Sequence, residues 1–264
     1  MQVRFMSWIA VLCALVLFSS LAFGQNAQAA RGGGRGARGN APDPASVPHD
    51  PHDLNGIWNF GGLRTLSNDP PPMTPEAKKK FDANKPSYGP RAIPPALGND
   101  PAGNCDPLGL VRLLLFPRPF EFVQVPGRVF QFLEWNHVWR TIWTDGRKLP
   151  EDPDPRWYGY SVGKWDGDTL VVDSVGFDDR TWLDQVGDPY SSEMRLQERY
   201  HRVGNTLELT MTLTDPKTYT RPWVSEKKVF NLLPNEEIRE EICAPSVEQE
   251  FNRRTRNPAG GIKK

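Results

Sequence analysis

The chain has 264 residues, of which 26 are proline and 23 are glycine, and its formal net charge is +0 at pH 7. Proline and glycine at this density suit many short strands and turns and argue against a helical bundle. The absence of net charge excludes the domain-wide basic field of nucleic-acid-binding domains, so we expect no nucleic-acid partner.

Residues 1–29 have the pattern of a signal peptide. Arg4 gives a positively charged start, residues 8–18 are apolar, and small residues then offer cleavage sites before Gln25 or Ala30. The apolar stretch is shorter than the roughly 20 residues of a spanning helix, so a retained membrane anchor is the less favoured alternative. We therefore predict an exported protein, periplasmic or extracellular, with no stable membrane insertion after the signal is removed.

Residues 30–52 are predicted to form a flexible linker, because they contain the string RGGGRGARGN followed by several prolines. An Arg-Gly tract can also bind RNA or an anionic surface, but an exported protein meets little nucleic acid. Residues 53–257 are long enough for a single β domain, and residues 258–264 are expected to be a frayed tail.

The first half of this domain is predicted to contain one strand and one helix. The Gly-x-Trp pattern of Gly56 and Trp58 enters a strand. Thr74 can cap a short helix over residues 75–84, which starts with a proline. Residues 86–110 are predicted to be irregular and to wrap a surface or cover an opening.

The rest of the domain has the pattern of consecutive strands followed by a helix. With the first strand they make eight to ten antiparallel strands in meander order, which predicts an all-β, up-and-down β-barrel. Ser246 and Gln249 form a capping box for a C-terminal helix that ends near residue 256. The predicted strands cover residues 120–125, 129–135, 138–145, 158–165, 168–176, 195–203, 206–214, 223–233 and 237–243. Two-residue hairpin turns are predicted at Asn136-His137, Asp166-Gly167 and Gly204-Asn205.

The hairpin of residues 195–214 also predicts which of its faces is buried. If Val203 pairs with Thr206, one face is largely apolar and the other is polar, as in an antiparallel sheet around an interior. The face expected to point inward contains Leu196, Glu198, Tyr200, Arg202, Leu207, Leu209, Met211 and Leu213.

Two cysteines, Cys105 and Cys243, remain after the predicted signal peptide. In an oxidising compartment we expect them to form a disulfide. Two separate buried thiols are the alternative, because the sequence does not place their Cα atoms within bonding range.

The order of a Gly-x-Trp strand, a meander and a C-terminal helix resembles the lipocalin and wider calycin arrangement, which implies a β-barrel. The strings WTDGRKLP, DPRWYGYSVGKWDGDTLVV and DDRTWLD resemble a large family of uncharacterised exported bacterial proteins. That resemblance implies export and attaches no activity. Where the family often continues with Gly-His-Pro-His-Ser, residues 187–191 are Gly-Asp-Pro-Tyr-Ser, which argues against a histidine site.

Glu198 is the first candidate for a functional residue. In the predicted register it lies opposite Met211 on the apolar face, where a carboxylate needs a partner or becomes protonated. Arg202, four residues along the same face, can reach it. Glu198 is therefore either a polar anchor in a ligand cavity or half of a structural Glu–Arg pair near the barrel rim.

An aromatic face in the hairpin of residues 129–145 gives the second candidate site. If Trp135 pairs with Val138, Glu134 shares a face with aromatic side chains, but the opposite face is also largely apolar. The pattern does not decide which face points inward. An aromatic lining with a few polar anchors is typical of small-molecule sites, and ordinary core is the alternative. The candidate ligand-binding residues are Glu134, Trp135, Trp139, Trp143, Trp157, Tyr160, Glu198, Tyr200 and Arg202.

No metal or cofactor site is predicted. The four histidines form no pair at metal-ligand spacing, and the sequence lacks phosphate-binding, dinucleotide-binding and nucleophile-elbow motifs. The aspartates of the connection at residues 177–193 do not have the spacing of a calcium loop, so an Asp–Arg network is favoured over Ca²⁺.

The sequence thus predicts an exported, lipocalin-like protein that binds an apolar or aromatic small molecule in a barrel cavity or at its mouth. Two alternatives stay open. One is a lyase, hydratase or hydrolase that uses a buried carboxylate on the same scaffold. The other is an envelope interaction module without a small ligand. The oligomeric state is left open.

Overall fold

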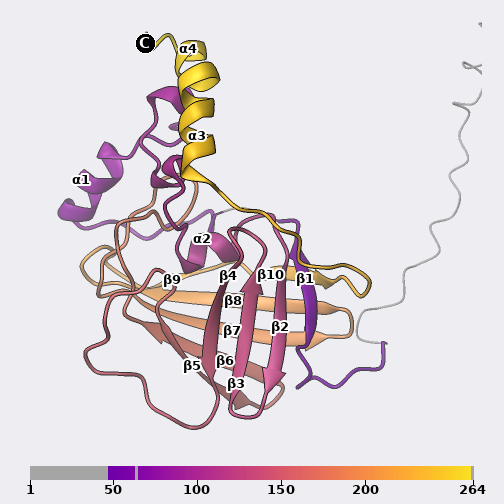
Figure 1. Cartoon of the computed structure of the whole chain (residues 1–264). Helices are drawn as coiled ribbons and strands as arrows, with labels where there is room; N and C mark the ends of the chain where they lie inside the picture. Colours follow the sequence, from indigo (N-terminus) through magenta and orange to yellow (C-terminus); the bar gives the residue numbers. More distant parts are fainter. Residues whose placement is uncertain (1–46, 63–64, 263–264) are drawn as a thin grey trace, which may run out of the picture. The chain divides into compact units, whose positions relative to one another are not determined.

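The fold is a closed β-barrel, seen in a computed structural model that describes residues 47–62 and 65–262 (Figure 1). The predicted signal peptide and most of the predicted linker lie outside the described residues. Figure 1 shows β2, β3 and β4 running steeply across the front, with β6, β7 and β8 crossing behind them.

Nine strands form the described ring, which confirms the predicted all-β barrel and its strand number. Strand β10 closes it, because it pairs with β1 on one side and with β8 on the other. Closure removes the exposed strand edges that an open meander would leave. The strands of the ring are β1 (Gly56–Phe60), β2 (Phe120–Val125), β3 (Arg128–Leu133), β4 (Val138–Trp143), β5 (Tyr160–Asp166), β6 (Thr169–Val175), β7 (Arg195–Val203), β8 (Thr206–Thr214) and β10 (Lys228–Leu232).

One pair of neighbouring strands, β4 and β5, is parallel, so the barrel is not a pure up-and-down meander. The two strands pair only at Ile142 with Ser161 and at Trp143 with Val162. Parallel neighbours need a crossover connection, and residues 144–159 provide it on the outside of the wall. The other strand pairs in the described barrel are antiparallel.

The predicted register of the hairpin β7–β8 is confirmed. Val203 pairs with Thr206, and the leucines of β8 are fully buried while its threonines are half-buried or exposed. In the hairpin β5–β6, Asp166 pairs with Thr169. The turn of this hairpin therefore consists of Gly167 and Asp168, one residue later than predicted. Gly167 takes the positive φ of that turn, +56°.

The hairpin β3–β4 pairs two residues away from the predicted register. Leu133, not Trp135, pairs with Val138, and a four-residue loop connects the strands. Within that loop Asn136 and His137 have φ of 59° and 48°, as predicted for turn residues. A shift of two residues keeps every strand side chain on its predicted face, because the side-chain period of a strand is two.

A short helix, α2 (Leu110–Leu114), covers one end of the barrel. The sequence analysis did not predict it. All five of its residues are buried, and its leucines belong to the same core as the barrel strands. A helix of five residues that is buried on every side gives no amphipathic period, so no pattern identified it. Arg112 within it is neutralised by Asp100 at 2.6 Å.

The remaining elements lie outside the ring and partly differ from expectation. The predicted first helix is present, and Thr74 caps it by accepting a hydrogen bond from the Ala77 amide. The C-terminal helix is also present, but its N-cap is Ala244 without a side-chain hydrogen bond, so the predicted capping box is wrong. These elements are α1 (Pro75–Ala83), the 3₁₀ turns η2 (Pro95–Leu97) and η3 (Pro101–Asn104), β9 (Trp223–Val224), α3 (Pro245–Phe251), the π-helical segment η4 (Asn252–Arg256) and α4 (Asn257–Ala259).

The predicted last strand, residues 237–243, is wrong. The segment makes one isolated bridge, between Glu241 and Trp135, and its backbone otherwise hydrogen-bonds to the loop between β3 and β4. The predicted strand of residues 223–233 is interrupted, because Ser225 bonds to Met211 of β8 and separates β9 from β10.

The predicted disulfide is confirmed. Cys105, at the end of η3, and Cys243, just before α3, have Cα atoms 5.4 Å apart and are separated by 138 positions. Closing a loop of this length stabilises the fold by about 5 kcal/mol in the chain-entropy model. Disulfides of this kind are typical of oxidising compartments. Among the described residues, no helix has the length and apolar character required to cross a membrane.

Candidate functional site

The short pairing between β4 and β5 leaves a pocket of about 490 Å³ on the outside of the barrel wall, called here the seam pocket. Its walls come from β4, from the start of β5 and from the end of the crossover. The lining residues are Trp139, Arg140, Thr141, Trp143, Pro155, Arg156, Trp157, Tyr158, Gly159, Tyr160 and Ser161.

Backbone contacts with the end of β6 hold the crossover in place at the pocket. The amide of Arg156 donates to the Gly176 carbonyl at 2.9 Å, and the Arg156 carbonyl accepts from the Asp178 amide at 2.9 Å. Gly159 has a φ of +66°, and a Cβ atom there would lie 2.7 Å from the Phe177 ring. Only glycine therefore suits the point where the crossover turns into β5.

Five aromatic side chains converge on the seam pocket. Trp139 and Trp143 point away from the barrel interior, because the alternating residues Arg140 and Ile142 point into it. Trp139 is 55 % exposed and also contacts Phe130 and Phe132 on the outer face of β3. The aromatic face of this hairpin is thus the outer one, which the sequence pattern left undecided. The converging residues are Trp139, Trp143, Trp157, Tyr158 and Tyr160.

Four arginines lie against these rings. The guanidinium of Arg147 is 3.5 Å from the Trp143 ring centroid, that of Arg180 is 4.5 Å from Trp157, and that of Arg156 is 5.4 Å from Tyr160. The guanidinium of Arg128, which does not line the pocket, is 5.6 Å from the Trp143 ring. Such cation–π contacts fix the ring orientations. Burial raises the pKa of Tyr158 to about 12, so its phenol stays neutral at physiological pH.

Two of these four arginines are neutralised within the chain. Arg147 pairs with Asp145 at 2.6 Å, and its hydrogen bonds hold the pKa of that carboxyl below its ordinary value. Arg180 pairs with Asp178 at 2.6 Å in the same way and also lowers the pKa of its partner. Among residues 47–62 and 65–262, no carboxylate forms an ion pair with Arg156 or with Arg128.

Beneath the pocket, a buried ion pair crosses the barrel interior. Arg140 Nη2 donates to Glu198 Oε1 at 2.6 Å and Arg140 Nη1 donates to Oε2 at 2.8 Å. Tyr200 donates its phenol hydrogen to Glu198 Oε1 at 2.7 Å, and Gln131 accepts from Arg140 Nε at 2.8 Å. Ser161 also contacts Arg140, so two pocket-lining residues belong to this network. Both carboxylate oxygens of Glu198 are therefore occupied.

Glu198 faces the interior opposite Met211 as predicted, but its partner is not Arg202. Arg202 instead pairs with Asp53 at 3.3 Å and lies 5.5 Å from the Trp58 ring. The expected Glu–Arg pair exists with an arginine from another strand. Sequence spacing identified a same-strand partner and could not identify one across the barrel.

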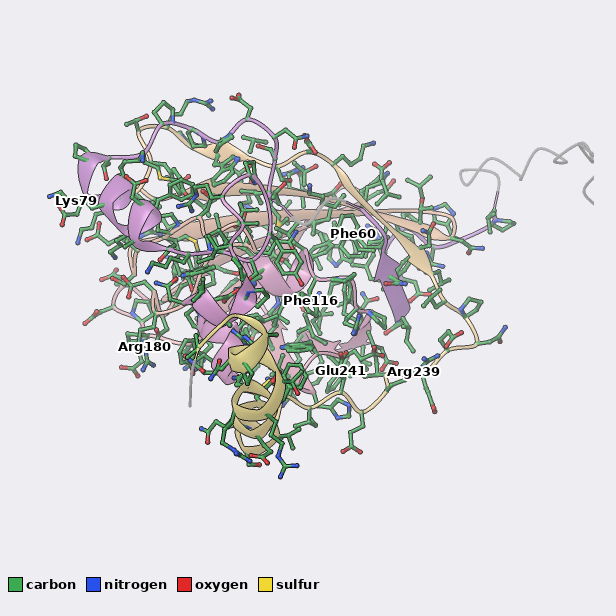
Figure 2. The ribbon with its side chains drawn as sticks, turned by 90° about the horizontal axis from the view of Figure 1, so that it is seen from above. Phe60, Lys79, Phe116, Arg180, Arg239 and Glu241 are labelled. Atoms are coloured by element: carbon green, nitrogen blue, oxygen red, sulfur yellow. A yellow bond between two sulfur atoms is a disulfide. The ribbon has the colours of Figure 1, made fainter. Side chains whose placement is uncertain are left out.

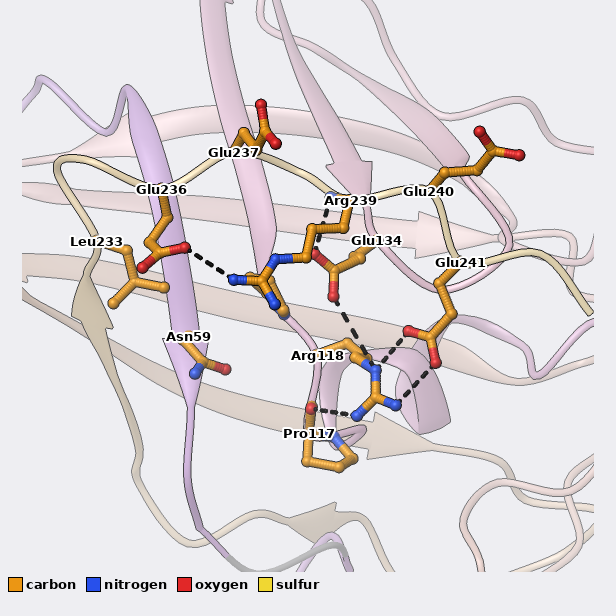
Figure 3. Close-up of a pocket in the computed structure, with 11 residues that line it drawn as sticks. Asn59, Pro117, Arg118, Glu134, Leu233, Glu236, Glu237, Arg239, Glu240 and Glu241 are labelled. Carbon is orange, nitrogen blue, oxygen red and sulfur yellow. Dashed lines mark hydrogen bonds and ion pairs between the residues drawn. The ribbon is translucent and has the colours of Figure 1, made fainter. Parts of the chain in front are cut away.

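Glu134 lies in a second pocket of about 580 Å³, called here the end pocket (Figure 3). Figure 3 shows Arg118 between Glu134 and Glu241, with Arg239 bonded to Glu236. The amide of Arg239 also donates to Glu134 Oε2 at 3.0 Å. These contacts attach the segment after β10 to the barrel.

The structure therefore divides the predicted site residues into separate groups. Trp139, Trp143, Trp157 and Tyr160 meet in the seam pocket. Trp135 lies in the β3–β4 loop and packs against Phe116, with ring centroids 4.9 Å apart. In Figure 2, Arg180 lies well apart from Arg239 and Glu241, so the two pockets are distinct.

Sequence reasoning missed Arg140 and Ser161, which lie on β4 and β5 and line the pocket. It also missed Arg147, Arg156 and Tyr158, which lie in or beside the crossover. The crossover was expected to be a plain connection between two antiparallel strands. The dense aromatic and arginine content of the string DPRWYGY is the signal that could have identified Arg156 and Tyr158.

The aspartates of the connection between β6 and β7 form a hydrogen-bonded network. Asp184 accepts from the amides of Val186 and Asp188 at 2.9 and 3.3 Å. Burial raises the pKa of Asp184, and burial with the nearby Asp184 charge raises the pKa of Asp188 to about 8. Among the described residues, no group of three or more His, Cys, Asp or Glu side chains is arranged to hold a metal ion.

No protein-family model matches the chain, and no curated protein sequence matches it significantly.

Proposed function

We propose that this protein is an exported binding protein that holds an apolar or aromatic small molecule in the seam pocket. The observation that carries the proposal is the convergence of five aromatic side chains on one concave site. A volume of about 490 Å³ lies in the range of small-molecule sites, which combine aromatic walls with a few polar groups. Arg140, Arg156 and Ser161 are the polar groups here.

The proposed site differs in location from the barrel cavity expected of a lipocalin-like protein. The inward-facing side chains, among them Trp58, Phe122 and Tyr200, are fully buried and belong to one core. The Arg140–Glu198 pair lies among them. Because side chains occupy this part of the interior, the open space beside the wall is the better supported location.

Export is supported by two independent features. The first is the pattern of residues 1–29, and the second is the disulfide between Cys105 and Cys243. N-terminal sequencing of the native protein tests export. A mature start near Gln25 or Ala30 supports it, and an intact Met1 in a membrane fraction overturns it.

Calorimetric titration with a planar neutral probe, 2-naphthamide, tests the binding site. Trp139→Ala and Trp157→Ala should each weaken binding by about tenfold, because each removes one aromatic wall. Trp139 is 55 % exposed, so its replacement leaves the fold intact. Tyr88→Ala is the matched control, because Tyr88 is 52 % exposed and lies outside the pocket lining.

Equal affinities in all four proteins would contradict the proposed site. Complete absence of binding would favour the alternative of an interaction module, for which the exposed ring of Trp139 beside Phe130 and Phe132 offers a surface.

A further inference from the structure

The charges around the seam pocket are unbalanced. Two arginines and no acidic residue line it, although about a quarter of the chain is charged. A pocket for a neutral or cationic ligand needs no such excess. The excess favours a ligand that brings a negative charge.

Most of the arginines at this site are already satisfied by the protein. Arg140 is paired with Glu198, Arg147 with Asp145 and Arg180 with Asp178, each with a closest distance of 2.6 Å. Arg140 lies at the floor of the pocket, and Arg147 and Arg180 lie at its rim. The positive charge of each is matched by its carboxylate partner. They contribute little net attraction for an anion.

Of the two arginines that line the pocket, Arg156 is the one without a carboxylate partner among the described residues. Arg128, beside the Trp143 ring, forms no ion pair either, but it lies outside the pocket lining. The backbone of Arg156 is fixed at both its amide and its carbonyl, so its side chain starts from a defined point in the wall. Its guanidinium lies beside the Tyr160 ring, and no carboxylate among the described residues forms an ion pair with it. A guanidinium with free donors beside an aromatic wall is suited to bind a carboxylate in bidentate geometry.

We propose that the ligand of the seam pocket is an aromatic or otherwise planar acid whose carboxylate is bound by Arg156. The aromatic side chains hold the apolar body, and Arg156 holds the acidic end. Tyr158 also lines the pocket, and burial keeps its phenol neutral, so it adds no negative charge that would oppose the carboxylate. This inference rests on the proposed function, because it names the ligand class of the same pocket.

The test compares acids with their amides, which have nearly the same shape and no charge. We suggest benzoate with benzamide, 2-naphthoate with 2-naphthamide, and biphenyl-4-carboxylate with its amide, measured by titration calorimetry. The protein should bind the best-fitting acid at least tenfold more tightly than its amide, which is the scale of a charge-assisted hydrogen bond. Arg156→Gln should remove this difference, and Arg156→Lys should retain part of it.

Lys85→Gln is the matched control for the loss of one positive charge. Lys85 is exposed, lies outside the pocket lining and forms no ion pair within the described chain. This variant should keep the preference for the acid. Equal losses in Arg156→Gln and Lys85→Gln would overturn the inference, because a general electrostatic field would then explain the preference.

The remaining outcomes separate the inference from the proposed function. If acid and amide bind equally while Trp139→Ala weakens both, the pocket is a binding site but the assignment of an acid is wrong. If neither member of any pair binds, both proposals are wrong. Far-ultraviolet circular dichroism of Arg156→Gln should match that of the unchanged protein, because the backbone contacts of Arg156 do not involve its side chain.

Discussion

The seam pocket and the end pocket have similar volumes, about 490 and 580 Å³, and opposite chemistry. The seam pocket is lined by five aromatic residues and two arginines, without an acidic residue. The end pocket is lined by five glutamates and two arginines, without an aromatic residue. Volume alone therefore does not distinguish the proposed binding site from a structural gap. The two pockets differ in which of their charged side chains are paired within the chain.

In the end pocket both arginines are paired with glutamates, while the exposed Glu237 and Glu240 form no ion pair within the described residues. Arg118 bonds to Glu241 and lies near Glu134, while Arg239 bonds to Glu236 (Figure 3). These pairs attach residues 237–243 to the barrel without strand pairing. In the seam pocket the paired arginines lie at the floor and the rim, and Arg156 has no carboxylate partner among the described residues. The first arrangement is that of a structural contact, and the second is the one on which the proposed binding site rests.

The largest effect in this comparison is expected at the floor of the seam pocket. Glu198→Gln leaves the buried guanidinium of Arg140 without a counter-charge, so we expect a loss of about 3–5 kcal/mol in the free energy of unfolding. Urea unfolding measures it. Glu208→Gln, which breaks the more exposed pair with Lys227, should cost less than about 1 kcal/mol.

The same variant separates a structural role of Glu198 from a ligand-binding role. The structural pairing predicts that 2-naphthoate still binds Glu198→Gln with unchanged affinity under conditions where the variant is folded. A stable variant that has lost 2-naphthoate binding would show that Glu198 belongs to the site instead.

The sequence predicted most where local patterns determine structure. The alternation of Leu207, Leu209 and Met211 with threonines determines both faces of β8, and a two-residue turn determines its register with β7. The Cys105–Cys243 pair was predictable because only two cysteines follow the predicted signal peptide.

The features that could not be predicted depend on contacts between distant segments. Arg140 and Glu198 are 58 positions apart and meet only because the ring closes. The parallel pairing of β4 and β5 has no turn motif, and the long proline-rich connection at residues 144–159 was its only local trace. The seam pocket exists because β4 and β5 pair in this way. Four of its aromatic residues were therefore named as candidates from the sequence, but the sequence did not show that they lie together in one pocket.

The next expected effect concerns pH and the loop that carries Arg180 to the seam pocket. Asp188 keeps its proton up to about pH 8 in the folded protein, whereas an unfolded aspartate loses it near pH 3.9. Between these values the unfolded state binds fewer protons, so stability should fall as pH rises from about 4 to about 8. The carboxyls with lowered pKa, such as Asp178, act in the opposite direction below this window.

Asp188→Asn should therefore increase stability at pH 9 and reduce the slope between pH 5 and pH 8, because an amide needs no proton beside Asp184. Urea unfolding at pH 5, 7 and 9 measures the effect. Asp69→Asn is the control, because the Asp69 side chain is 92 % exposed, and it should keep the original slope. Parallel profiles for the unchanged protein and Asp188→Asn would refute the assignment.

The smallest expected effect compares the same exchange, arginine to glutamine, in the two pockets. Arg118→Gln breaks the contact with Glu241 in the end pocket, and because Arg118 is 39 % exposed we expect a loss of only about 1 kcal/mol. Its affinity for 2-naphthoate should not change. Arg156→Gln breaks no ion pair within the described residues, so its stability should change by less than about 0.5 kcal/mol while its affinity for 2-naphthoate falls. Urea unfolding and calorimetry on both variants measure the two quantities. The distinction between a structural pocket and a binding pocket fails if Arg118→Gln weakens 2-naphthoate binding as much as Arg156→Gln does, because the charges of the end pocket would then also act on the ligand.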